Sequence, residues 1–85
     1  MDKYYVYILR CADNTLYTGI AKDYKNRLDM HNAGKASKYT RGRLPVEIVY
    51  LETQDSKGEA LKREYAIKKL TKKQKIKLLK KRSNF

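Results

Sequence analysis

The sequence predicts one α+β domain, in which a small three-stranded antiparallel sheet is flanked by helices in the order β-β-α-β-α-α. Three observations support this fold class. The chain has 85 residues, enough for a single hydrophobic core. Hydrophobic residues make up 41% of it, which argues against a disordered chain. Strand-like and helix-like segments then follow one another with short connections, so we assign residues 1–85 to one domain.

Two strands joined by a tight turn are predicted at the start of the chain. Residues 4–10, Tyr-Tyr-Val-Tyr-Ile-Leu-Arg, are β-branched and aromatic, as a largely buried strand requires. Asn14 can adopt the left-handed conformation of a hairpin turn. In the second strand, residues 16–20, side-chain alternation places Tyr17 and Gly19 on one face. These segments predict an antiparallel hairpin.

The first helix is predicted over residues 24–33. Asp23 is a favoured N-cap residue, and Gly34 is a favoured terminator. Arg27 and His31 are four residues apart, so they share one face of this helix.

The remainder alternates between a loop, a strand and two helices. Residues 35–43 are polar and basic and predict a loop, and residues 46–51 predict the third strand. Ser56 to Glu59 fits a capping box for a helix that ends near Leu70. The same pattern from Thr71 to Gln74 predicts a separate last helix.

The charge balance points to a polyanionic partner. Lys and Arg number 21 against nine Asp and Glu, which gives a formal net charge of +12. Nucleic acid is the favoured partner of such a chain, with an anionic membrane surface or neither as alternatives. No apolar segment approaches the length of a spanning helix and no signal segment is present, so we expect a cytoplasmic protein without a membrane partner.

Basic residues concentrate in two segments, residues 35–43 and 68–82. A solvated helix face would explain the second, but both together favour a track for the phosphate backbone. The predicted nucleic-acid-binding residues are Lys35, Lys38, Arg41, Arg43, Lys68, Lys69, Lys72, Lys73 and Lys77.

Three stretches together resemble the GIY-YIG nuclease superfamily. They are Tyr-Val-Tyr-Ile-Leu-Arg-Cys from residue 5, Leu-Tyr-Thr-Gly-Ile from residue 16 with the later Arg-Leu-x-x-His-Asn, and Ala-Leu-Lys-Arg-Glu-Tyr-Ala-Ile-Lys-Lys-Leu from residue 60. The likeness is to small stand-alone bacterial members, similar to the N-terminal nuclease domain of the UvrC excision-repair protein. It extends over nearly the whole chain.

The resemblance implies a site. Tyr7 and Tyr17 match the motif tyrosines and Gly19 the motif glycine, and Arg27 matches the catalytic arginine. His31 matches a histidine found on the same helix in many members. Glu64 matches the glutamate that binds a divalent metal ion, Mg²⁺ or Mn²⁺. The matched residues are Tyr7, Tyr17, Gly19, Arg27, His31 and Glu64.

These residue types suit phosphodiester hydrolysis. Magnesium accepts few carboxylates and several waters, and a guanidinium offers phosphate a planar set of donors. A tyrosine acts as a base only if its pKa falls well below about 10, which a nearby Arg27 or metal ion would favour. His31 would support that tyrosine or donate to phosphate. Each residue also has an ordinary alternative: strand tyrosines usually pack, and Arg27 could pair with Asp23 on an exposed surface.

The resemblance therefore predicts a metal-dependent endonuclease that hydrolyses DNA, with a role in repair or recombination. The alternative is a non-catalytic nucleic-acid-binding module, or a nuclease subunit completed by a protein partner that supplies specificity. Two departures from the family pattern support the alternative. Tyr5 stands where the first motif has glycine, and the asparagine that many active members carry late in the chain has no counterpart before Asn84.

A catalytic site requires one further condition. We expect Tyr7, Tyr17, Arg27, His31 and Glu64 to converge on a concave surface on one side of the sheet. A structure with Glu64 on the opposite face of the sheet from Tyr17 would refute this assignment.

Overall fold

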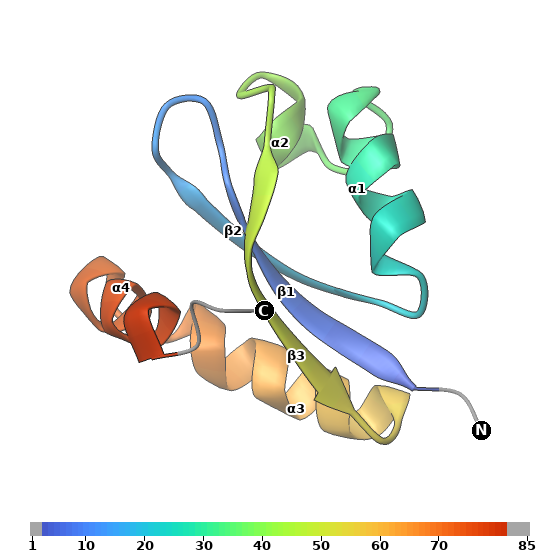
Figure 1. Cartoon of the computed structure of the whole chain (residues 1–85), viewed down its shortest axis with the longest axis vertical. Helices are drawn as coiled ribbons and strands as arrows, with labels where there is room; N and C mark the ends of the chain where they lie inside the picture. The colour runs from blue at the N-terminus through green and yellow to red at the C-terminus, as the bar shows by residue number, and fades with distance from the viewer. Residues whose placement is uncertain (1–2, 82–85) are drawn as a thin grey trace.

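The sheet has three antiparallel strands with the first strand at its centre. A computed structural model describes residues 3–81, so Arg82 of the basic segment and Asn84 lie outside the described residues. The strands are β1 (Tyr4–Arg10), β2 (Leu16–Ala21) and β3 (Glu47–Gln54), in the order β2-β1-β3 (Figure 1). β2 is therefore an edge strand, which matters for the site described below.

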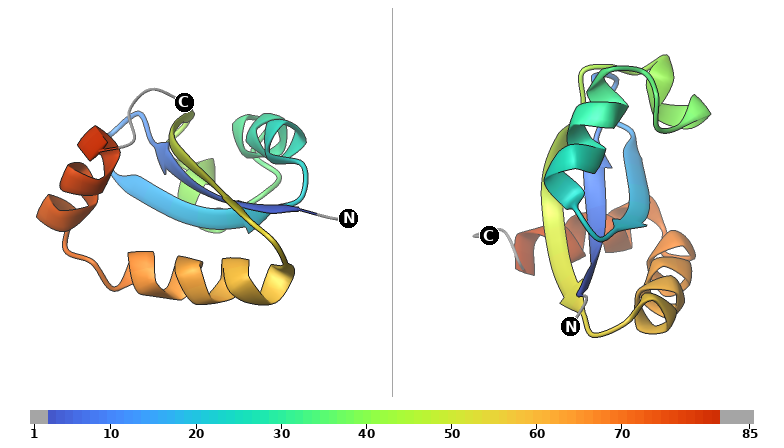
Figure 2. Two further views of the ribbon diagram at one scale, coloured as in Figure 1. Left: turned by 60° about the horizontal axis from the view of Figure 1, so that its bottom comes forward. Right: turned by 90° about the vertical axis from the view of Figure 1, so that its right-hand side faces the viewer.

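Helices cover both faces of the sheet. They are α1 (Tyr24–Asn32), α2 (Lys38–Arg41), α3 (Lys57–Lys68) and α4 (Lys72–Lys81). α1 lies on one side of the sheet, and α3 lies on the other side and is followed by α4 (Figure 2). The predicted fold class and element order are confirmed, with α2 as an addition.

The predicted caps and turn form as expected. The side chains of Asp23 and Ser56 each accept a hydrogen bond from the backbone N–H three residues later, at 3.0 and 3.2 Å. Thr71 and Gln74 exchange two such bonds, at 3.2 and 2.9 Å, and complete a capping box. Asn14 adopts a φ of 67° in the β1–β2 turn.

The loop predicted over residues 35–43 is wrong in one part, because it contains the single turn of α2. Ser37 caps this turn by accepting from the backbone N–H of Tyr39 at 3.1 Å. A four-residue helix has no room for an apolar repeat, so periodicity does not reveal it.

The third strand continues three residues beyond its predicted end at Leu51. Polar residues there indicated a loop, but the side chain of Glu52 is largely buried and bonded. It accepts from Arg63 Nε at 2.7 Å and from the Tyr50 hydroxyl. A carboxylate with these partners is tolerated inside the domain, so pairing with β1 extends to Gln54.

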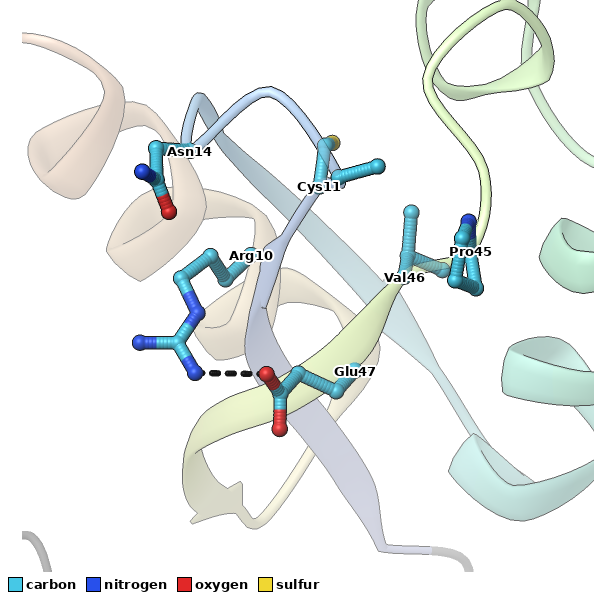
Figure 3. A pocket seen from close by; sticks show the side chains of 7 residues that line it. Arg10, Cys11, Asn14, Pro45, Val46 and Glu47 are labelled. Atoms are coloured by element: carbon cyan, nitrogen blue, oxygen red, sulfur yellow. Dashed lines mark hydrogen bonds and ion pairs between the residues drawn. The ribbon is translucent and has the colours of Figure 1, made fainter.

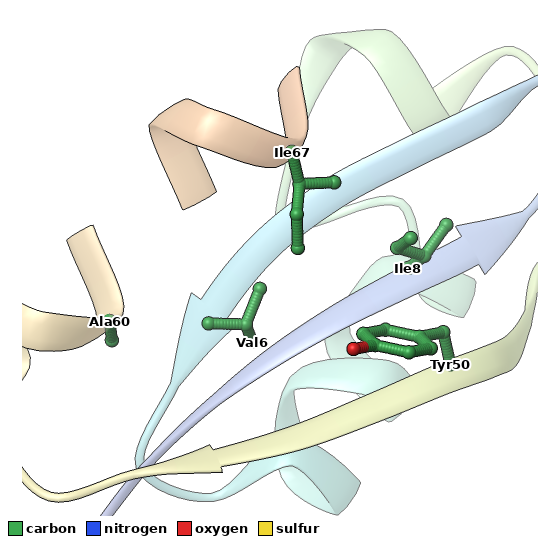
Figure 4. Close-up of a cluster of buried hydrophobic side chains, with 5 residues drawn as sticks. All are labelled: Val6, Ile8, Tyr50, Ala60 and Ile67. Carbon is green, nitrogen blue, oxygen red and sulfur yellow. The ribbon is translucent and has the colours of Figure 1, made fainter. Parts of the chain in front are cut away.

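Each face of the sheet packs against its own helices. On one face Val6, Ile8 and Tyr50 form a buried cluster with Ala60 and Ile67 of α3 (Figure 4). The other face has a second cluster, whose buried members are Tyr7, Leu9, Cys11, Ala21 and Val46. Tyr17 and Leu28 of α1 pack against this second cluster, so the motif tyrosines belong to the α1 side.

Candidate active site

The ring of Tyr7 lies across the backbone of Gly19. The two residues are direct cross-strand partners in β1 and β2. A Cβ atom at position 19 would stand 2.6 Å from the Tyr7 hydroxyl oxygen, 2.7 Å from Tyr7 Cζ and 3.2 Å from Tyr17 Cε2. Only a residue without a side chain leaves room for both tyrosines, which explains why glycine occupies this position.

His31 holds the Tyr7 hydroxyl. The side chain of His31 is buried in the domain and is 1% exposed. Its Nε2 lies 3.0 Å from the Tyr7 oxygen, and its Nδ1 lies 2.9 Å from Thr40 Oγ1. The Thr40 hydroxyl donates its hydrogen to the Ser37 carbonyl oxygen at 3.4 Å. The Thr40 oxygen can therefore accept a hydrogen bond from Nδ1–H of His31. Nε2 is then the acceptor of the Tyr7 proton.

Tyr17 is packed between two rings. Its ring meets His31 edge-on at a centroid distance of 5.2 Å and stacks on Tyr39 at 5.7 Å. The Arg43 guanidinium lies over the Tyr39 ring at 4.2 Å from its centroid and is bonded to Asp13 at 3.0 Å. This stack fixes Tyr17 while leaving it half-buried at the surface of the domain.

The electrostatic environment keeps Tyr7 protonated and His31 neutral. Burial raises the pKa of Tyr7 above its ordinary value of 10.0, and Tyr17 and Glu64 act in the same direction, whereas Arg27 opposes them. Burial and the charge of Arg27 lower the pKa of His31 below 6.5. Arg27 lowers the pKa of Tyr7, in the expected direction, but burial outweighs the guanidinium and the net shift is upward.

Glu64 does not lie on the expected side of the sheet. It belongs to α3, which packs on the face opposite to Tyr17. The same-side expectation is therefore wrong, and the site in its predicted form, on one face of the sheet, is refuted. A site that includes Glu64 would have to extend around β2, which is an edge strand. The negative charge of Glu64 contributes to the raised pKa of Tyr7.

The Glu64 carboxylate is accessible but already has a partner. Its side chain is 19% exposed, and Lys68 Nζ lies 3.1 Å from it, one helical turn away. Among residues 3–81, no group of three or more His, Cys, Asp and Glu side chains forms a cluster fit for a metal ion. A divalent ion here would therefore have fewer than three such protein ligands.

The two basic segments meet beyond the start of β2. A hollow of about 210 Å³ is lined by Leu16, by Tyr39 of α2 and by Lys72 and Lys75 of α4. Several predicted nucleic-acid-binding residues also have partners within the protein. Lys72 donates to the Asn14 carbonyl, Lys69 covers the Tyr65 ring, Lys68 pairs with Glu64 and Arg43 pairs with Asp13.

A separate hollow of about 410 Å³ contains none of the predicted site residues (Figure 3). It lies where β1 ends and β3 begins, with the Arg10–Glu47 ion pair along it at 2.5 Å. No motif tyrosine, basic track residue or metal-binding candidate lines it. We therefore do not include it in the site.

Two residues of the site were missed by sequence reasoning. Thr40 bonds His31, and Tyr39 stacks on Tyr17. Both lie in α2, within the segment predicted to be a loop. Ser37 as a helix cap would have indicated that this segment is ordered, but nothing in the sequence indicates that it contacts α1 and β2.

A family model identifies the class to which this domain belongs. The profile of the GIY-YIG catalytic domain matches residues 3–77, and the chain belongs to the GIY-YIG family. Members of this family act on nucleic acid and generally use divalent metal ions.

Small bacterial proteins resemble the whole chain. It is 57% identical to a UPF0213 protein of Staphylococcus epidermidis over 93% of this chain and 96% of the relative. It is 51% identical to a UPF0213 protein of Staphylococcus aureus over 96% of this chain and all of the relative. The solution NMR structure of a UPF0213 protein from Bacillus halodurans matches with a TM-score of 0.64 at 40% identity, covering 96% of this chain and 87% of that one.

A second solved structure agrees with the first. The solution NMR structure of a protein from E. faecalis matches with a TM-score of 0.65 at 40% identity, covering 95% of this chain and 86% of that one. In the described part of this chain, no helix combines the length and apolar character needed to cross a membrane.

The donor set at Glu64 fits a divalent ion of the magnesium type. Mg²⁺ typically takes one or two carboxylates and fills its other positions with water and substrate phosphate. Glu64 would supply the carboxylate, and its charge contributes to the raised pKa of Tyr7. Lys68 would have to give up its ion pair with Glu64 on metal binding. When bound, such an ion stabilises negative charge on phosphate and leaving-group oxygens.

Proposed function

We propose that this protein is a metal-dependent endonuclease that hydrolyses phosphodiester bonds in DNA. The observation that carries the proposal is the Tyr7–His31 hydrogen bond, 3.0 Å long and lying directly over Gly19. It joins the Tyr7 hydroxyl to a neutral proton acceptor, and the charges of Arg27 and Glu64 both act on the pKa of this hydroxyl. A packing role alone would not require this combination of groups.

Proton transfer is assigned to the Tyr7–His31 pair. Because Tyr7 keeps its proton in the free protein and His31 is neutral, the Tyr7 oxygen accepts the proton of the attacking water as its own proton moves to Nε2. Thr40 holds Nδ1 and thereby keeps Nε2 free to accept. Tyr17, half-buried beside Gly19, orients the water and the phosphate.

Charge stabilisation is assigned to Arg27 and Glu64. The Arg27 guanidinium donates to the phosphate oxygens that gain negative charge during the reaction. Glu64 would hold the divalent ion. The DNA backbone beyond the cleaved bond lies on the basic segments of α2 and α4, which contribute affinity without sequence selection.

The second candidate function is a nucleic-acid-binding module, or a nuclease completed by a partner protein. A specific observation favours it: the described residues contain no cluster of three or more His, Cys, Asp and Glu side chains that could hold a metal ion. In this case the Tyr7–His31 pair would be a structural remnant, and DNA binding would not lead to cleavage. The two candidate functions differ in whether the wild-type protein cleaves DNA when a divalent metal ion is present.

The test is a cleavage assay on flapped, branched, nicked and single-stranded DNA with Mg²⁺ or Mn²⁺. Wild-type protein should cleave at least one substrate only when metal is present. Glu64→Gln should lower the rate about 100-fold or more, because an amide is a poor magnesium ligand, while DNA binding stays intact or tightens slightly. Glu59→Gln is the matched control on the same helix, since Glu59 is exposed and pairs only weakly with Lys62 at 3.9 Å.

Arg27→Ala completes the design. It should also abolish cleavage while weakening binding only modestly, because its donors act mainly on the transition state. Wild-type protein that binds DNA but never cleaves it would favour the binding module. Cleavage that persists at full rate in Glu64→Gln would refute the assignment of Glu64.

A further inference from the structure

An open hollow at the far end of β2 adjoins the candidate site. Its volume is about 460 Å³, and it is lined by Tyr4 of β1, the end of β2, the first turn of α1 and the first residue of α3. Its polar lining consists of Lys22, Asp23, Asn26, Arg27 and Lys57. Since α1 and α3 lie on opposite faces of the sheet, this hollow wraps around the open edge of β2.

The charge of this hollow suits an anion. Three of its side chains are cationic, Lys22, Arg27 and Lys57, and one is anionic, Asp23. The Asp23 carboxylate already caps α1 through the backbone N–H of Asn26, at 3.0 Å. Among the described residues none pairs with the Lys57 amine, so this cation is available to an external ligand.

The position of the hollow identifies the anion. Arg27 belongs both to the hollow and to the electrostatic environment of Tyr7, so the two sites share a wall. At the opposite end of β2, Leu16 borders the hollow that contains Lys72 and Lys75. Cationic hollows thus lie at both ends of the edge strand, with Tyr17 and Gly19 between them. A row of negative charges along the edge would fill this arrangement, and a nucleic-acid backbone is such a row.

We propose that the hollow around Lys22, Asn26 and Lys57 binds the phosphate next to the one held by Arg27, so that the cut strand follows the open edge of β2. This inference rests on the proposed function for the identity of the strand. It adds a phosphate site that the motifs do not contain, since none of these three residues belongs to the matched catalytic set. The Asn26 amide and the two ammonium groups supply the donors.

The experiment uses DNA oligonucleotides in which one phosphate at a time is replaced by an uncharged methylphosphonate. Binding is measured by fluorescence anisotropy in EDTA, so that no cleavage occurs. Each oligonucleotide is tested against wild type, Lys57→Ala, Arg27→Ala and the control Lys62→Ala, whose exposed side chain lies on α3 outside the hollow. Wild type should bind the oligonucleotide with the neutralised hollow phosphate roughly five-fold more weakly than the unmodified DNA. Lys57→Ala should bind these two oligonucleotides equally well, because its contact with that phosphate is already lost.

A residue is coupled to a phosphate when its substitution by alanine removes the loss of affinity caused by neutralising that phosphate. Lys57 and Arg27 should be coupled to adjacent phosphates. The proposal is overturned if Lys57→Ala behaves like Lys62→Ala, or if its coupled phosphate lies several nucleotides from that of Arg27. Because binding is measured without metal, adjacent coupling in a protein that cleaves nothing would refute the nuclease function alone. Cleavage without any Lys57 coupling would refute the hollow alone.

Discussion

Substituting Gly19 by alanine tests the centre of the candidate site. The new methyl group would stand 2.6 Å from the Tyr7 oxygen and 2.7 Å from Cζ, closer than carbon atoms approach these atoms in folded proteins. Tyr7 has little freedom to retreat, because it is 2% exposed and bonded to His31. Overpacking of this kind costs about 1–3 kcal/mol, and for a domain of this size each kcal/mol lowers Tm by roughly 4–8 °C.

The matched control is Gly42→Ala. Nothing lies within 4 Å of a Cβ at position 42, and its φ of −92° suits alanine. This variant should therefore keep or slightly raise the stability of the protein. Thermal unfolding followed by circular dichroism measures both variants, and a cleavage assay follows the site.

The double variant Gly19→Ala with Tyr7→Phe refines the test. Phenylalanine removes the oxygen but keeps Cζ at 2.7 Å from the methyl group, so stability should not recover. If Gly19→Ala unfolds at the same temperature as wild type, the Tyr7 ring does not lie over Gly19 and the geometry of the site is incorrect.

Three further predictions concern the neighbouring groups. Thr40→Val should lower the cleavage rate roughly ten-fold, because Nδ1 loses its acceptor, whereas Thr40→Ser should restore it; equal rates in both variants would exclude the positioning role. His31 has a lowered pKa in the folded state, so its contribution to stability is complete above about pH 6.5 and decreases as the pH falls below it, by at most about 1.4 kcal/mol per pH unit. Urea unfolding between pH 5 and 7.5 should show this slope in wild type and lose it in His31→Gln; the same slope in both would place its origin elsewhere. Replacing Lys73 and Lys77, one turn apart on α4, by alanine should weaken binding to all DNA sequences alike and reduce the log–log salt slope by up to about 1.8; an unchanged slope would place the DNA elsewhere.

The elements were predictable where local chemistry determines them. Asp23, Ser56 and Thr71 cap their helices through side-chain bonds that involve residues three positions away. Such bonds are visible in a sequence because both partners stand at a fixed spacing. The alternation that placed Tyr17 and Gly19 on one face holds for the same reason.

Contacts between distant segments were not predictable in this way. The burial of His31 depends on Thr40 and Tyr7, which approach it from other elements. Glu52 is tolerated in β3 because Arg63 of α3 reaches it, although the two are 11 residues apart in sequence. The resemblance identified Glu64 as a site residue, but only the packing of α3 revealed that it lies on the face opposite to Tyr17.

The division of the candidate site between two layers has a consequence for how the protein would lose activity. Tyr7, Tyr17 and His31 belong to the layer formed with α1 and α2, and Glu64 belongs to the layer of α3 and α4. Proteins open in parts below the free energy of global unfolding. A transient detachment of α3 would remove the metal-binding carboxylate while the tyrosine–histidine pair stayed intact, so the fraction of competent molecules would follow the local opening equilibrium of one helical layer.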